Sequence, residues 1–212
     1  MLVRAVLFDF DGTLADSFAP ITASTNQVRA AVGLPALTVD EIRRHVGLGL
    51  PQLMADLAPG LPVAEAVSLY GKHHETIMLT QTTLLPGVKD SLAVLHARGY
   101  LLGVCSNKRV EFTKKLLHAL RLDDMMRVTL GPDDVGVPKP DPAMLIEAMR
   151  RLNVSAAETI YVGDMAVDVR AAHAAGIPVW LVPGNAHFQE DPLALKPDRV
   201  LATFQEMLET LP

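Results

Sequence analysis

AVLFDFDGTLADS, residues 5–17, is the stretch from which the organisation of this chain can be read. Its first half is almost entirely apolar, which is typical of a strand buried on both faces of a parallel sheet. Asp9 and Asp11 follow at alternate positions, and Gly12 then interrupts the regular backbone. Because ligands bind beyond the carboxyl ends of strands in an open α/β sheet, these two carboxylates are candidate site residues. The alternative is a solvated acidic turn, since Asp-Gly is a common turn dipeptide.

The composition of the chain bounds its class and its partners. Its 212 residues suit one large domain or one domain with an insertion, and half of them are hydrophobic. The formal net charge is −5, so we expect neither a nucleic acid nor a membrane as a partner. Cys105 is the single cysteine, which favours a reducing compartment. Met1 leads directly into the first strand and no long apolar run follows, so we expect a cytoplasmic protein.

Residues 18–84 show no strand-like alternation and predict an all-helical insert. Helices are expected at about 19–32, from Thr38 onward, up to about Leu57 and at about 63–79. Thr38 and Glu41 have the spacing of a capping box. Insertions of this kind enter where a loop lies over the site. We therefore predict a cap domain of residues 18–84 and a core domain of residues 1–17 and 85–212.

From Leu85 onward, helices alternate with short apolar strands. Strands are expected at 101–105, 127–130, 159–162, 178–182 and 198–201. Asp141 and Pro142 predict the cap and the first residue of one intervening helix, and Thr203 with Glu206 predicts the start of the last helix. This alternation predicts an α/β fold with a doubly wound, Rossmann-like parallel sheet that carries the helical cap.

Polar side chains follow several of the predicted strands. They are Asp9 and Asp11, then Ser106 and Asn107, then Asp164 with Asp168, while Lys139 lies in a proline-rich loop. Because parallel strands end at one edge of the sheet, we expect these side chains to converge. Carboxylates so close together need a cation between them, and Mg²⁺ prefers such oxygen ligands. The set suits metal-assisted phosphoryl transfer.

The roles follow from the chemistry of the groups. One aspartate can attack phosphorus to give an aspartyl-phosphate, and a second can move the proton of the leaving alcohol. Ser106, Lys139 and the backbone amides of Phe10 and Asn107 would bind the oxygens of the transferred group. Plainer interpretations exist for each residue taken singly: an N-cap for the Ser-Asn pair and a surface lysine for Lys139. The adjacent histidines His73 and His74 are expected on the surface of a helix rather than as metal ligands.

These motifs together resemble the haloacid dehalogenase superfamily of phosphatases over almost the whole chain. Residues 9–14, DFDGTL, look like its first motif, and Ser106 resembles the second. Lys139 resembles the third motif, and Gly163-Asp164 with Asp168 resembles the fourth, GDxxxD. The helical insert directly after the first motif looks like a C1-type cap, as in phosphoglycolate phosphatases and β-phosphoglucomutases.

The resemblance implies a role for each matching residue. Asp9 matches the nucleophile and a Mg²⁺ ligand, and Asp11 matches the general acid and base, with its carbonyl as a further ligand. Asp164 matches the direct metal ligand, and Asp168 matches the acid that holds metal-bound water or Lys139. Thr13 and Ser106 match hydroxyls that contact phosphate, and Lys139 matches the lysine that steadies nucleophile and phosphate. Met165 replaces a small hydroxyl residue of many relatives, and we expect it to affect packing.

The expected enzyme is a Mg²⁺-dependent phosphatase that hydrolyses a small phosphorylated metabolite, similar to phosphoglycolate, as a monomer or homodimer. Two alternatives stay open: a β-phosphoglucomutase-like mutase and, from another class, a phosphate-sensing module without turnover. Asp11 disfavours dehalogenation, because dehalogenases of the family usually lack this second aspartate. Residues 43–49, and Arg43 above all, are where substrate contacts in the cap are expected.

Overall fold

The computed structural model describes residues 3–182 and 191–211. Its centre is a six-stranded sheet in the order β5-β4-β1-β6-β7-β8, and every neighbouring pair runs parallel. The strands are β1 (Ala5–Phe8), β4 (Leu101–Cys105), β5 (Met126–Leu130), β6 (Thr159–Gly163), β7 (Val179–Leu181) and β8 (Arg199–Val200). Each expected strand is present, with its ends shifted by two residues at most.

Strand β1 lies in the middle of the sheet and is buried on both faces, as its apolar sequence predicts. Its register pairs Ala5 with Leu101 of β4 and with Thr159 of β6. Alternate side chains enter different clusters, since Val6 and Phe8 join one hydrophobic core and Leu7 joins the other. The shared strand direction places the carboxyl ends of β1, β4 and β6 at one edge of the sheet.

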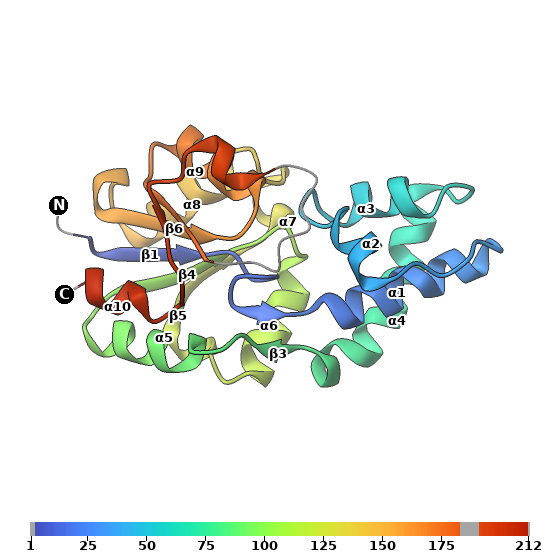
Figure 1. The fold of residues 1–212 in the computed structure, drawn as a ribbon, viewed down its shortest axis with the longest axis horizontal. Coiled ribbons are helices and arrows are strands. Elements are labelled where there is room, and N and C mark those ends of the chain that lie inside the picture. The colour runs from blue at the N-terminus through green and yellow to red at the C-terminus, as the bar shows by residue number, and fades with distance from the viewer. Residues whose placement is uncertain (1–2, 183–190, 212) are drawn as a thin grey trace.

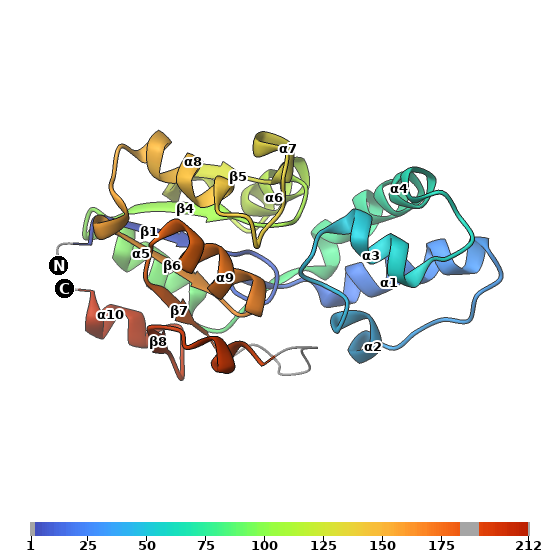
Figure 2. The same ribbon diagram turned by 90° about the horizontal axis from the view of Figure 1, so that it is seen from above.

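Helices cover both faces of this sheet, above and below it in Figure 1. One layer packs with Val6 and Phe8, and the other packs with Leu7. The first layer holds α5 (Val88–Ala97), α6 (Val110–Ala119) and α10 (Glu206–Thr210), and the second holds α8 (Ala143–Leu152) and α9 (Ala166–Ala175). Figure 2 shows α8 and α9 on their side of the strands. The predicted doubly wound α/β fold is confirmed.

Four further helices lie beyond the carboxyl ends of the strands, at the right of Figure 1. They are α1 (Phe18–Ala31), α2 (Val39–Arg43), α3 (Leu50–Leu57) and α4 (Val63–Gln81). They enclose a hydrophobic cluster of their own, to which Ile21, Ile42 and Leu53 contribute from three of the helices. Thr38 and Glu41 form the predicted capping box at the start of α2. All four expected helices are present, and the exact domain boundaries at residues 17/18 and 84/85 stay a prediction.

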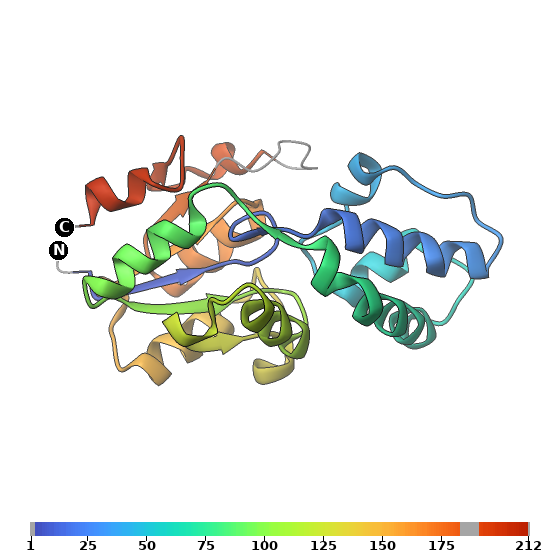
Figure 3. The ribbon, with the colours of Figure 1, turned by 90° about the horizontal axis from the view of Figure 1, so that it is seen from below.

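Two short strands connect these helices to the sheet and run side by side in Figure 3. Strand β2 (Ala15–Asp16) pairs antiparallel with β3 (Thr83–Leu84). This ribbon could not be predicted from the sequence, because strands of two residues have no alternation to recognise. Four other short elements complete the described chain: η1 (Asp123–Met125), α7 (Pro132–Val135), η2 (Ala156–Glu158) and η3 (Pro192–Leu195).

Two helices begin later than the sequence indicates. Helix α8 begins at Ala143, with Pro142 as its cap, although Asp141 Oδ1 still accepts a hydrogen bond of 2.9 Å from the Ala143 amide. Helix α10 begins at Glu206, because the Glu206 carboxylate accepts from the amide of Ala202 instead of completing a box with Thr203. Across residues 3–182 and 191–211, no helix has the length and apolarity needed to cross a membrane.

Gly103 generates a test of this packing, because it lies in β4 directly between Leu7 of β1 and Val128 of β5. A Cβ atom there would come within 2.5 Å of Val128 Cγ1 and 2.9 Å of Leu7 Cδ2. We predict that Gly103→Ala lowers the free energy of unfolding by roughly 1–3 kcal/mol, measured by denaturant titration. Gly71→Ala in α4 is the matched control. Its Cβ would meet other atoms only at 3.7 Å or more, so we expect a gain of about 0.5–1 kcal/mol. Equal effects of both changes would contradict the tight pairing of β1, β4 and β5.

Candidate active site

The loop after β1 is folded tightly around one carbonyl group. The amides of Thr13, Leu14 and Ala15 all donate to the carbonyl oxygen of Phe10, at 3.3, 3.0 and 3.1 Å. The Phe10 ring is buried in the hydrophobic core. Gly12 has a φ of +85°, and a Cβ atom on it would lie 2.3 Å from Asp164 Oδ2. Only glycine fits both the left-handed backbone and this approach to the fourth motif.

Lys139 is the centre of the site and is completely buried. Its ammonium group donates to Asp168 Oδ1 and Tyr161 Oη at 2.7 Å, and it lies 3.0 Å from Asp9 Oδ1. An ammonium group has three N–H donors, so these three contacts satisfy it. Burial acts to lower the pKa of Lys139, but the carboxylates of Asp168 and Asp9 outweigh it and the pKa is raised. The surface-lysine interpretation is therefore wrong.

Asp168 holds this arrangement from the first turn of α9. Its Oδ2 accepts from the backbone amides of Asp164 and Met165 at 3.1 and 2.9 Å, so the side chain is fixed before it meets Lys139. A Cβ atom at Gly163 would lie 2.4 Å from Asp168 Cγ, which explains the glycine in that position. Both oxygens of Asp168 are thus engaged within the protein.

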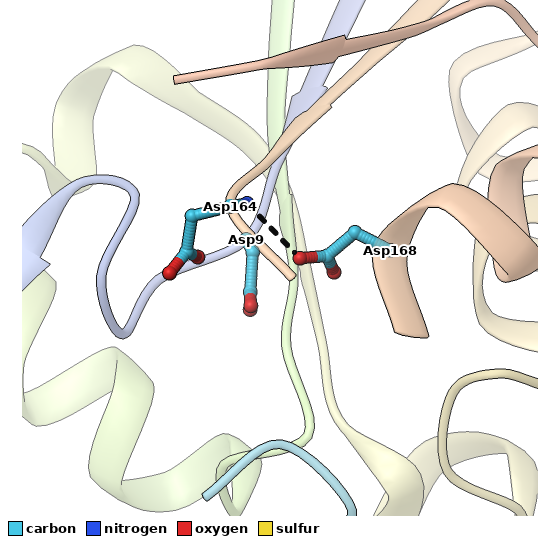
Figure 4. A group of neighbouring side chains, drawn as sticks. All are labelled: Asp9, Asp164 and Asp168. Carbon is cyan, nitrogen blue, oxygen red and sulfur yellow. Dashed lines mark hydrogen bonds between the residues drawn. The ribbon is translucent and has the colours of Figure 1, made fainter. Parts of the chain in front are cut away.

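Three carboxylates converge beside Lys139, and Figure 4 shows Asp9 between Asp164 and Asp168. One oxygen from each lies within 4.8 Å of the others. Burial raises the pKa of Asp9 to about 6, against the opposing effect of the Lys139 ammonium. Burial and the neighbouring carboxylates of Asp168 and Asp9 also raise the pKa of Asp164 well above its usual range. Buried carboxyl groups this close together cannot all ionise without a cation between them, and their oxygens suit a hard divalent cation such as Mg²⁺.

The structure places the hydroxyl and amide groups of the first motif against these carboxylates. Thr13 Oγ1 donates to Asp164 Oδ1 at 2.8 Å, and the Phe10 amide donates to Asp9 Oδ1 at 2.7 Å. Both groups were expected to contact phosphate. Ser106, buried at the end of β4, donates a hydrogen bond to Asp9 that acts to lower the pKa of that carboxyl. The phosphate contacts of Phe10, Thr13 and Ser106 stay predictions.

Asp11, two residues after Asp9, has its own partners. Its carboxylate accepts from Ser17 Oγ and lies 2.9 and 3.0 Å, through Oδ1 and Oδ2, from the ammonium of Lys108. Ser17 precedes α1 but makes no cap hydrogen bond with its side chain, because that hydroxyl serves Asp11. Lys108 and Tyr161 were not among the site residues expected from the sequence. The position of Lys108 two residues after Ser106, at a strand end, was the available signal.

Asn107 joins the core to the helical insert. Its amide group donates to the carbonyl of Gly47 at 2.6 Å and to that of Lys139 at 2.9 Å, and its Oδ1 accepts from the Lys139 amide at 2.7 Å. Met165 of the core also lies close to Gly47, because a Cβ atom on Gly47 would lie 3.0 Å from Met165 Sδ. The side chain of Asn107 thus fixes the Lys139 loop against the insert, and the expected contact of its backbone amide with phosphate stays a prediction.

A cavity of about 60 Å³ lies between the sheet edge and the insert. Asp9, Asp11 and Ser106 line it from the core, and Leu53 and His74 line it from the insert. His74 is buried, so the expectation that it lies on the surface is wrong. Arg43 was expected to contact substrate but does not line this cavity. Its guanidinium instead lies 4.2 Å from the centre of the Phe18 ring and 3.7 Å from Asp40.

The Asn107 contacts generate a prediction that needs no knowledge of the substrate. Asn107→Ala removes the hydrogen bond that holds Gly47, and a hydrogen bond of this kind contributes about 1 kcal/mol. We therefore expect the amides of His45 and Val46, which are protected by hydrogen bonds within their loop, to exchange roughly fivefold faster. Hydrogen exchange followed by mass spectrometry measures this, with the β1 amides as the internal control. Unchanged exchange at residues 45–46 would show that Asn107 does not hold the loop.

Comparison with known proteins agrees with this geometry. The family of haloacid dehalogenase-like hydrolases matches residues 6–182. A phosphoglycolate phosphatase of Cupriavidus necator is 36% identical over 98% of this chain and 91% of its own length. A phosphoglycolate phosphatase of Photorhabdus laumondii is 32% identical over 99% of this chain and 92% of its own. A predicted phosphoglycolate phosphatase from Haemophilus somnus superposes with a TM-score of 0.92, at 26% identity over 99% of this chain and 98% of that one. This chain therefore belongs to the haloacid dehalogenase-like hydrolase family and is a phosphatase within it.

Proposed function

We propose that this phosphatase hydrolyses a small phosphomonoester of the phosphoglycolate type, with Mg²⁺ and through an aspartyl-phosphate on Asp9. The observation that carries the proposal is the position of Asp9, whose carboxylate is held by Lys139 at the carboxyl end of β1 and lines the cavity. The family membership and the relatives called phosphoglycolate phosphatases support the reaction class and the substrate class.

Asp9, Asp164 and the carbonyl of Asp11 are the residues that would hold Mg²⁺. When bound, the ion supplies positive charge for the phosphate oxygens and lets neighbouring carboxylates stay ionised. The buried carboxylates of Asp9, Asp164 and Asp168 fit this requirement, because one oxygen of each lies within 4.8 Å of the others. Asp168 is linked to these ligands through Lys139, which forms ion pairs with both Asp168 and Asp9.

The reaction then follows from the chain's own groups. An oxygen of Asp9 forms a bond to phosphorus while the bond from phosphorus to the ester oxygen breaks, and Asp11 donates a proton to the departing alkoxide. Asp11, now ionised, takes a proton from water, whose oxygen attacks the aspartyl-phosphate and releases inorganic phosphate and free Asp9. Lys139 and Ser106 stabilise the charge on the phosphoryl oxygens.

The size of the cavity favours a small substrate. A water molecule needs roughly 10–15 Å³ in a cavity measured in this way. A cavity of about 60 Å³ therefore suits a phosphoryl group with a leaving group of few atoms. We further propose a cytoplasmic enzyme, a monomer or homodimer, with a small phosphorylated metabolite as its partner. The mutase alternative has less support, because Arg43, its candidate for a second phosphate, does not line the cavity.

The assignment of Asp9 is tested by Asp9→Asn. An amide cannot act as the nucleophile, so we predict that release of phosphate from p-nitrophenyl phosphate falls by at least about 1,000-fold, while circular dichroism shows an intact fold. Asp90→Asn, a change of an exposed aspartate in α5, is the control and keeps wild-type turnover. In Asp11→Asn, acid-quenched enzyme should carry a phosphoryl group on Asp9, detected by mass spectrometry. Retained turnover in Asp9→Asn would remove Asp9 from the mechanism.

Metal dependence has a readout that does not require turnover. If Mg²⁺ binds the folded site, about 100 times its Kd in free Mg²⁺ raises stability by about 2.7 kcal/mol, which corresponds to a rise in Tm of roughly 5–10 °C. The rise should shrink as the pH falls below about 6, because protons compete at Asp9, whose raised pKa lies there. Asp164→Asn should abolish the rise, and chelation should stop hydrolysis. An unchanged Tm together with full activity in chelator would exclude the metal site.

A further inference from the structure

Beyond the acidic edge, the wall of the cavity is largely apolar. Val46, Leu50 and Leu53 line it from the insert, and Phe112 and Met165 line it from the core. A leaving group with several hydroxyls, such as a sugar, would leave those hydroxyls without hydrogen-bond partners against this wall. The wall therefore selects a leaving group that is short and has few polar atoms.

Lys108 interrupts this apolar wall with a buried positive charge. Its side chain is 6% exposed, and its ammonium group contacts both carboxylate oxygens of Asp11. Those contacts use at most two of its three N–H donors, and within residues 3–182 and 191–211 no other acceptor is bonded to it. Lys108 lines the cavity, so a donor and a positive charge remain available to a ligand there.

His74 lines the same cavity from the insert. The ring stacks on Tyr70 at a centroid distance of 4.9 Å, and it is 1% exposed. Its Nδ1 lies 3.2 Å from Ser24 Oγ, whereas its Nε2 is without a partner in the described part of the chain. Six buried side-chain polar atoms in that part have no partner, and His74 is the one residue among their owners that lines the cavity.

The imidazole of His74 is neutral and adds no charge to the cavity. Burial, together with the ammonium of Lys108, lowers the pKa of His74 to about 3. Its Nδ1 shares the Ser24 hydroxyl with Nδ1 of His73, which lies 3.1 Å from the same oxygen, and the carbonyl of Pro20 accepts a hydrogen bond from the His74 ring. The buried positive charge of the cavity wall is therefore that of Lys108.

We propose that Lys108 forms an anion subsite that binds a carboxylate on the leaving group of the substrate. Lys108 supplies the charge and an N–H donor, while the apolar wall excludes longer polar groups. The preferred substrates are then phosphate monoesters of short hydroxy acids. This inference rests on the proposed phosphatase function and specifies which residue determines its substrate. Lys108 is a specificity-determining residue.

The test compares two substrates that differ at the proposed contact. Phosphoglycolate carries a carboxylate where 2-hydroxyethyl phosphate carries a neutral hydroxymethyl group. The wild-type enzyme should prefer phosphoglycolate at least tenfold in kcat/KM, and Lys108→Met should reduce that preference roughly 10- to 100-fold, as loss of a charge-assisted hydrogen bond does. Lys114→Met, which removes an exposed lysine of α6, is the control and keeps the wild-type preference.

The ratio of the kcat/KM values for the two substrates distinguishes binding of the carboxylate by Lys108 from mere positioning of Asp11. If Lys108 only positions Asp11, Lys108→Met slows both substrates equally and the subsite is overturned. A wild-type enzyme that hydrolyses both esters equally well also overturns the subsite and leaves the phosphatase function intact. Lys108→Gln repeats the measurement with a side chain that can still hydrogen bond to Asp11, in case the methionine variant does not fold.

A binding measurement distinguishes failure of the subsite from failure of the proposed function. Calorimetry of phosphoglycolate with Asp9→Asn, with and without Lys108→Met, needs no turnover. At least tenfold weaker binding in the double variant supports the subsite even if the wild-type enzyme releases no phosphate. Equal binding overturns it, whatever the wild-type activity.

Discussion

A buried ammonium group between two carboxylates is the interaction on which the rest of this structure depends. Lys139 contacts Asp9 and Asp168 and has almost no exposure to water. An unpaired buried charge would be strongly destabilising, so each member of this group requires the others. The group also connects three separate parts of the chain: the end of β1, the proline-rich loop before α8 and the first turn of α9. Tyr161 from β6 supplies the remaining acceptor and itself donates to the carbonyl of Cys105 in β4.

The same charges explain why the site calls for a cation. Asp9, Asp11, Asp164 and Asp168 are buried, and the ammonium groups of Lys139 and Lys108 lie beside them. Four carboxylates and two ammonium groups leave a deficit of two positive charges, which a divalent ion would supply. Burial, together with the neighbouring carboxylates, raises the pKa of Asp9 and of Asp164, so without such an ion protons supply part of the charge.

The helical insert completes the site rather than merely covering it. Asn107 links the Gly47 carbonyl of the insert to the loop that presents Lys139, so the position of the insert and that of the central lysine are coupled through one side chain. The β2–β3 ribbon provides the only two crossings of the described chain between these parts, at either end of the insert. The insert also contributes His74 and most of the apolar wall, while the sheet edge contributes Asp9, Asp11 and Ser106.

The order of the elements and the residues at the strand ends could be predicted from the sequence. Alternation of apolar segments with polar residues at their ends is a local pattern, and Asp9, Lys139, Asp164 and Asp168 meet because parallel strands share an edge. Lys108, Tyr161 and the burial of His74 could not be predicted, because each depends on which side chain of a distant element lies opposite. Arg43, where a substrate contact was expected, does not line the cavity, and the sequence could not show this because its position near a cap loop does not reveal which way that loop faces. The sequence by itself determined which polar groups gather at the sheet edge, because these groups follow strands that all run in the same direction. The tertiary structure alone decided which groups surround the leaving group, because the insert's orientation sets those contacts.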